Sequence, residues 1–148
     1  MTQFLLDTNV LIAILNDRPA CVRARFIHEI KRESRLYLSA IVEFELRYGI
    51  AKSTQTEQNE EKLSLLLRSP LLRLPFDFED ATSAGPIRAL LEKQGNPIGA
   101  YDVQIAGQAV RRELTLVTAN VAEFKRVPNI KIVDWTASEK TKRKSTRE

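Results

Sequence analysis

The chain has 148 residues, of which 43% are hydrophobic and 28% charged, values ordinary for one folded domain that buries a core without disulfide or metal staples. The formal net charge is +4, but most of this charge lies after residue 135, in a stretch with no apolar face to bury. The composition excludes a largely disordered chain. It predicts one domain over residues 1–135, followed by a basic, disordered tail over residues 136–148.

Hydropathy and cysteine usage give expectations about location. No apolar stretch approaches the roughly 20 residues that span a bilayer. The N-terminus lacks the basic region, apolar run and cleavage site of a secretory signal. The single cysteine, Cys21, cannot form an internal disulfide, and its neighbours Ala20 and Val22 favour a packed side chain over a nucleophile. We expect a cytoplasmic protein without a membrane segment.

Short apolar runs alternate with helical patterns along the chain. The predicted strands are residues 4–6, 36–38, 71–76, 116–118 and 130–134. The predicted helices are residues 10–15, 21–32, 42–52, 57–68, 78–94 and 101–113. The glycine- and proline-rich residues 95–99 must break the chain between the last two helices. Strands that alternate with helices imply an α/β fold with a parallel sheet.

Asp7 is the first candidate for a functional residue. It stands directly behind the first apolar run, where a helical pattern begins. In open α/β sheets ligands bind beyond the carboxyl ends of the strands, so this side chain points into the usual site of the fold. The alternative is that Asp7 only caps the following helix, because Asp, Thr and Asn are all good capping residues. The position alone leaves both interpretations open.

Two further carboxylates are directed inward. On a helix over residues 42–52, Val42 and Leu46 fall on the stripe that faces the sheet, with Glu45 on its edge, whereas Glu43 falls among the solvated positions. Asp102 falls on the core side of the helix over residues 101–113. A first-turn acid is also favoured by the helix dipole, and for Asp102 taken alone this is the simpler explanation.

Three inward carboxylates together favour a metal site. Desolvation and mutual repulsion would destabilise them unless a cation lay among them. Carboxylates without histidine or cysteine partners suit Mg²⁺ or Mn²⁺. His28, the only histidine, lies in a basic helix and is expected at the surface. The sequence has no glycine-rich phosphate loop. Metal-activated water that hydrolyses a phosphodiester is the chemistry that remains.

At these residues the chain resembles PIN-domain ribonucleases, and within them the VapC toxin family of type II toxin–antitoxin systems. The similarity runs from about Phe4 to Trp135. The motifs that carry it are Leu6-Asp7-Thr8-Asn9, Glu45-Leu46-Arg47-Tyr48-Gly49, Pro97-Ile98-Gly99-Ala100-Tyr101-Asp102 with Ile105-Ala106, and Leu116-Val117-Thr118 followed by Asn120 and Glu123-Phe124.

The resemblance implies a PIN-like α/β fold, with a central parallel β-sheet flanked by α-helices. It implies an endoribonuclease toxin that depends on Mg²⁺, with Mn²⁺ as a substitute. The positions that match the family's acidic site, which would be both catalytic and metal-binding, are Asp7, Glu45, Asp102 and Glu123. Thr8 and Thr118 match hydroxyl positions near that site. The expected partners are a VapB-type antitoxin, an RNA substrate such as a tRNA, and a second copy of the chain in a homodimer.

Two positions depart from the pattern. Asn120 stands where many PIN domains carry an aspartate, and Ala119 stands where such toxins often carry Asn. The first departure keeps open a catalytically silent PIN domain that only binds nucleic acid or protein. A third interpretation, an aspartate-dependent phosphohydrolase, requires a second acid two residues after Asp7, where Asn9 stands. Rim cations, among them Arg47, Arg88 and Lys125, would contact the RNA phosphates.

Overall fold

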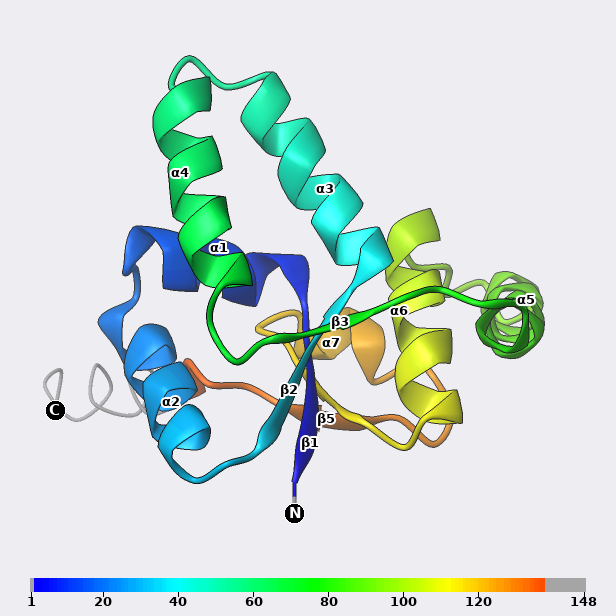
Figure 1. Cartoon of the computed structure of the whole chain (residues 1–148). Coiled ribbons are helices and arrows are strands. Elements are labelled where there is room, and N and C mark those ends of the chain that lie inside the picture. Colours follow the sequence, from blue (N-terminus) through cyan, green and yellow to red (C-terminus); the bar gives the residue numbers. More distant parts are fainter. Residues whose placement is uncertain (1, 138–148) are drawn as a thin grey trace, which may run out of the picture.

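The computed structural model describes residues 2–137 and shows five strands and seven helices over them (Figure 1). The strands are β1 (Gln3–Leu6), β2 (Arg35–Ser39), β3 (Leu72–Leu74), β4 (Thr115–Val117) and β5 (Lys131–Val133). The helices are α1 (Thr8–Asn16), α2 (Ala20–Lys31), α3 (Ala40–Ala51), α4 (Thr56–Leu67), α5 (Phe78–Lys93), α6 (Ala100–Arg111) and α7 (Val121–Phe124). Residues 138–148, most of the predicted tail, lie outside the described residues.

All strand pairs in the sheet are parallel, and the strand order is β3-β2-β1-β4-β5. The predicted α/β fold with a parallel sheet is confirmed. β1 lies at the centre, where Leu5 and Leu6 are fully buried, as is typical of a sheet covered on both faces. Because the strands are parallel, the ends of β1, β2 and β4 meet at one edge. This edge is where α1 and α3 begin.

The helices form layers around the sheet (Figure 1). α2 lies on one side and α6 on the other, while α3 and α4 project beyond the carboxyl ends of β1 and β2. Ser39 starts α3 by accepting a hydrogen bond from the backbone N–H of Ile41 at 3.2 Å. Over residues 2–137, no helix has the length and apolarity of a membrane span.

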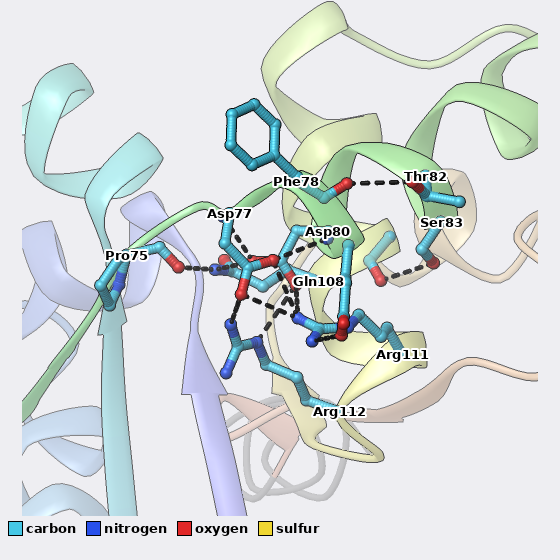
Figure 2. Close-up of polar contacts among 11 residues, drawn as sticks. Pro75, Asp77, Phe78, Asp80, Thr82, Ser83, Gln108, Arg111 and Arg112 are labelled. Atoms are coloured by element: carbon cyan, nitrogen blue, oxygen red, sulfur yellow. Dashed lines mark hydrogen bonds and ion pairs between the residues drawn. The ribbon is translucent and has the colours of Figure 1, made fainter.

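α5 is attached to the body of the protein mainly through α6. At Gly107 the two helices approach so closely that a Cβ would lie 2.6 Å from the Cα of Ala84, so glycine is needed there. Charged groups fix one end of this pair: Figure 2 shows Asp77 and Asp80, at the start of α5, facing Arg111 and Arg112 at the end of α6. Gln108 joins them through its amide, 3.2 Å from Asp80 Oδ2.

The element boundaries differ from the predicted ones for identifiable reasons. The third strand ends at Leu74 instead of residue 76 because Pro75 has no N–H to donate. α1 begins at Thr8, two residues early, because Asp7 caps it. The four-residue α7 is a helix that the sequence did not predict, since one turn shows no hydrophobic periodicity.

Candidate active site

The four predicted acids come from four different elements around the carboxyl edge of the sheet. Asp7 follows β1, Glu45 lies on α3, Asp102 lies in the first turn of α6 and Glu123 lies on α7. The charges of Asp7, Glu45 and Glu123 all raise the pKa of Asp102, so the fold brings the four carboxylates within electrostatic range of one another. Residues that are up to 116 positions apart in the sequence therefore form one acidic cluster, defined here as these four residues.

Asp7 serves as a helix cap and as a member of the cluster. Its side chain is 3% exposed. Oδ1 accepts a hydrogen bond from the backbone N–H of Thr8 at 2.8 Å, and Oδ2 accepts one from the hydroxyl of Thr118 at 2.8 Å. Burial raises the pKa of Asp7, while these two bonds act in the opposite direction. The two interpretations of Asp7 were not exclusive, because capping uses one oxygen and Thr118 orients the other.

Glu45 is held by the residue that follows Asp7. The hydroxyl of Thr8 donates to Oε1 of Glu45 at 3.1 Å, so Thr8 contacts both acids, one through its backbone and one through its side chain. Burial raises the pKa of Glu45, the Thr8 bond partly offsets this effect, and the charge of Asp7 raises the pKa further. The inward orientation that was predicted for Glu45 agrees with burial of Val42 and Leu46 on the same helix.

Asp102 has the most perturbed pKa of the cluster. Its pKa is raised to about 6, first by burial and then by the charges of the other three acids. Gly99 leaves room for its carboxylate, since a Cβ at this position would lie 2.9 Å from Asp102 Oδ2. A first-turn dipole alone would lower the pKa, so the simpler explanation of Asp102 as a helix acid does not account for this site.

The departure at Asn120 has a structural role of its own. Its side-chain amide donates to Oε2 of Glu123 at 3.0 Å, and its backbone N–H donates to the hydroxyl oxygen of Thr118 at 3.0 Å. Thr118 in turn donates to Asp7. A continuous chain of hydrogen bonds therefore connects Glu123 to Asp7. The sequence did not predict this arrangement; Ala119, the other departure, is exposed.

Among the described residues, no basic side chain is paired with the acidic cluster. Within residues 2–137, none of the four acids forms an ion pair with lysine or arginine. Glu43 is the contrast, two residues from Glu45 on α3. Burial would raise the pKa of Glu43, but its bonds to Arg47 at 3.1 Å and Arg73 at 2.8 Å outweigh burial and lower it.

The donor set fits a hard divalent cation that keeps much of its water. All four groups are carboxylates, three of them have raised pKa values, and oxygen donors are those that Mg²⁺ and Mn²⁺ prefer. In the described part of the chain, no three His, Cys, Asp or Glu side chains are placed to hold an ion together. Mg²⁺ commonly binds through one or two carboxylates and several waters, so the arrangement suits water-mediated binding.

Three basic residues were predicted to contact RNA at the rim of the site, and two of them form ion pairs within the chain. Arg47 is paired with Glu43, and Arg88 is paired with Glu92 at 3.1 Å, so both cations are already engaged within their own helices. Lys125, after α7, is exposed. His28 is exposed on α2, as expected. Beside the cluster, a groove of ≈ 240 Å³ lies between α1, α3 and α4, and its lining includes Glu45.

Comparison with known proteins decides the family. The PIN domain family matches residues 4–130, and the chain is 41% identical over 135 residues to a tRNA(fMet)-specific endonuclease VapC of Salmonella typhimurium, covering 91% of this chain and 99% of the relative. The chain belongs to the PIN-domain family, among the VapC ribonucleases. Ribonuclease VapC2 of Rickettsia felis is 36% identical, covering 89% of this chain and 97% of that protein.

Solved VapC structures share the fold. VapBC2 from Rickettsia felis, bound to a DNA fragment from their promoter, superposes with a TM-score of 0.84 at 35% identity, covering 90% of this chain and 99% of that chain. DNA-bound VapBC from Salmonella typhimurium superposes with a TM-score of 0.81 at 40% identity, covering 91% of this chain and 99% of that chain. PIN domains of this kind are nucleases and in general depend on a divalent metal ion. The catalytically silent binding module is therefore not favoured.

Proposed function

We propose that the chain is the toxin of a type II toxin–antitoxin pair and that it hydrolyses phosphodiester bonds in RNA with Mg²⁺, or with Mn²⁺ as a substitute, at Asp7, Glu45, Asp102 and Glu123. The observation that carries the proposal is the convergence of four acids without a basic partner in the described chain, together with a pKa of about 6 at Asp102. Such an arrangement is unfavourable for stability unless a cation joins it. A function that requires a cation explains why the arrangement exists.

The four acids have different roles in this proposal. Asp7 and Asp102 would hold the ion directly or through water, and Glu123 would contribute from the outside through the bond with Asn120. When bound, the ion supplies a more acidic water and stabilises negative charge on phosphate and leaving oxygens. Glu45, oriented by Thr8, accepts the proton of the attacking water. The raised pKa of Glu45 lies closer to neutral pH than that of an ordinary glutamate, which suits a general base.

Thr8 and Thr118 act as positioning residues. Asp7 receives one hydrogen bond on each oxygen, at 2.8 Å from the Thr8 N–H and 2.8 Å from the Thr118 hydroxyl. Both bonds fix the carboxylate in one orientation. Fixed orientation of the acids reduces the reorganisation that is needed when phosphate enters the site.

The relatives suggest the substrate and partners. The Salmonella typhimurium relative is named for tRNA(fMet), and the solved relatives are VapBC complexes. We therefore propose a tRNA as the substrate in the cytoplasm, a VapB-type antitoxin as the inhibitor and a homodimer as the assembly. An antitoxin arginine would satisfy the unpaired carboxylates, and an antitoxin segment would fill the groove beside Glu45.

Cleavage of total cellular RNA by the purified, antitoxin-free protein tests the proposal. We expect a discrete product with Mg²⁺ or Mn²⁺ that disappears with EDTA and with Asp7→Asn, whose amide still caps α1. Glu45→Gln and Glu43→Gln form a matched pair, because the two acids lie on the same helix and only Glu43 has arginine partners. Loss of cleavage in Glu45→Gln alone supports the proposal. Metal-independent cleavage, or equal loss in both variants, contradicts it.

A further inference from the structure

Two exposed aromatic rings lie next to the acidic cluster. Phe44 precedes Glu45 on α3, and Tyr101 precedes Asp102 on α6. Their ring centroids are 5.6 Å apart with an interplanar angle of 56°, yet Phe44 is 54% exposed and Tyr101 46%. The two rings therefore touch each other across two helices while both keep a large surface in solvent. Figure 1 shows the start of α3 beside the start of α6.

The exposed surface continues along α3. Tyr48 follows Phe44 by four residues, so the two side chains lie on the same face of the helix, and Tyr48 is 60% exposed. Lys52, four residues further, places its ammonium 4.7 Å from the centre of the Tyr48 ring. We call Tyr101, Phe44, Tyr48 and Lys52 the aromatic track. It begins at two residues adjacent to the cluster and ends at a cation.

The four residues of the track do not belong to the hydrophobic core. Single exposed apolar residues are common on protein surfaces and require no function. Here three exposed aromatic residues lie on the neighbouring helices α3 and α6, and two of them are in ring contact, whereas Val42 and Leu46 form the buried side of α3. Aromatic rings and a cation in succession are the elements with which proteins bind single-stranded nucleic acid, because every base has a face that can stack.

We propose that the aromatic track binds unpaired RNA, with one base stacked on the Phe44–Tyr101 pair, the next nucleotide on the Tyr48 side, and a phosphate at Lys52. This inference rests on the proposed ribonuclease function and adds that the enzyme prefers unpaired RNA to duplex RNA as its substrate. A base held on the pair places the neighbouring phosphodiester at Glu45 and Asp102. Bases inside a duplex cannot reach the rings, so the site selects loops or single strands.

Binding of an RNA decamer with one 2-aminopurine tests the track directly, because the fluorescence of this base is quenched when it stacks. The parent protein carries Asp7→Asn so that the RNA is not cut. We expect quenching and saturable binding, and a 5- to 150-fold loss of affinity, on the order of one lost stacked base, with loss of quenching in Phe44→Ala or Tyr101→Leu. Tyr101→Phe, which restores the ring, should restore quenching.

A matched control and a salt titration sharpen the test. Phe78→Ala removes an aromatic side chain that is 93% exposed at the opposite end of the α5–α6 pair, and should leave binding unchanged. Lys52→Gln should reduce the slope of log K against log salt by about 0.7, the loss of one phosphate contact on a single strand. The parent protein should bind the same sequence more weakly when it is annealed into a duplex.

The alternative occupant of the track is a protein, either a second copy of the chain or the antitoxin. If Phe44→Ala leaves RNA affinity and quenching unchanged but alters the sedimentation coefficient or antitoxin binding, the RNA proposal is wrong. It is also wrong if the parent protein binds no decamer. Metal-dependent cleavage of total RNA by the chain without substitutions then shows whether the ribonuclease function stands without the track.

Discussion

The molecule contains two clusters of acids that solve the same electrostatic problem in opposite ways. At the junction of α5 and α6, Asp80 is fully buried, and Arg111 donates to it at 2.7 Å and Arg112 at 3.1 Å (Figure 2). Burial would raise its pKa, but these bonds, with the N–H of Asp77, lower it to about 2. At the carboxyl edge of the sheet, burial and like charges raise the pKa of Asp102 to about 6.

The comparison shows what distinguishes a structural acid from a candidate functional one. The Asp77–Asp80 cluster contains its own cations, which join two helices, so its charges are satisfied by folding. The cluster of Asp7, Glu45, Asp102 and Glu123 contains hydroxyl and amide donors but no cation among the described residues. Folding leaves its charge unsatisfied, and a ligand must complete it. The following substitutions separate the two clusters.

Asp7→Asn should have the largest effect on activity. We expect RNA cleavage to fall roughly 10²- to 10³-fold, about 3–4 kcal/mol of transition-state stabilisation, while the free energy of unfolding stays constant or rises. The carboxylate is needed for the ion, whereas the cap on α1 persists with asparagine. Initial cleavage rates and urea denaturation measure the two quantities. Unfolding of the variant would show that Asp7 is structural.

Asp80→Asn should produce the opposite pattern. We expect the free energy of unfolding to fall by about 3 kcal/mol, because two arginines lose their buried charge partner. In the wild-type protein this contribution is complete above pH 4 and is lost as the pH falls through about 2. Denaturant titration measures the loss. At temperatures below its melting transition the variant should still cleave RNA. If the folded variant does not cleave RNA, Asp80 is needed for activity and the two acidic clusters do not have separate roles.

Asp102→Asn should stabilise the protein when divalent ions are absent. The folded pKa of about 6 exceeds the unfolded value of 3.8, so ionisation opposes folding, and wild-type stability falls as the pH rises from about 4 to 6. At pH 7 we expect the variant to be more stable by about 1–2 kcal/mol after allowance for partial solvation. The gain should vanish at pH 4. Thermal melts of the variant and the wild-type protein at pH 7 and pH 4 measure the difference in stability. A variant that is less stable than the wild-type protein at pH 7 would contradict the prediction.

Thr8→Val should have the smallest effect. The variant keeps the backbone N–H that donates to Asp7, the cap of α1, and loses only the hydroxyl that donates to Glu45 at 3.1 Å. We expect a roughly fivefold decrease in cleavage, about 1 kcal/mol, with little change in stability. Thr8→Ser, which restores the hydroxyl, provides the control. If serine fails to restore the rate, the hydrogen bond to Glu45 is not the cause.

The sequence was most informative where one local signal determined one position. The junction of strand and helix located Asp7. Helical periodicity predicted Glu45 and Asp102 to face inward, and both are half-buried. It was wrong for Glu43, whose side chain is only 16% exposed because Arg47 and Arg73 pair with it. The sequence was least informative where contacts depend on chain topology. The Thr118 bond to Asp7 spans 111 positions and exists because β1 and β4 are neighbours in the sheet.

The remaining differences have the same origin. Glu123 was identified only by the family resemblance, because the one-turn α7 has no periodic signal. The ion pair of Asp80 with Arg111 spans 31 positions and exists because α5 and α6 pack against each other. Asn120 looked like a lost ligand in the sequence, whereas the structure shows its amide bonded to Glu123. Its effect on metal binding stays a prediction.

Electron paramagnetic resonance of Mn²⁺ added to the metal-free protein tests the central claim most directly, because it counts bound ions without requiring a substrate. The account predicts saturable binding that Asp7→Asn and Asp102→Asn abolish, that Glu43→Gln leaves intact, and that weakens below pH 6 as Asp102 becomes protonated. Absence of saturable binding, or binding that survives both aspartate substitutions, would contradict the claim that this cluster is completed by a cation.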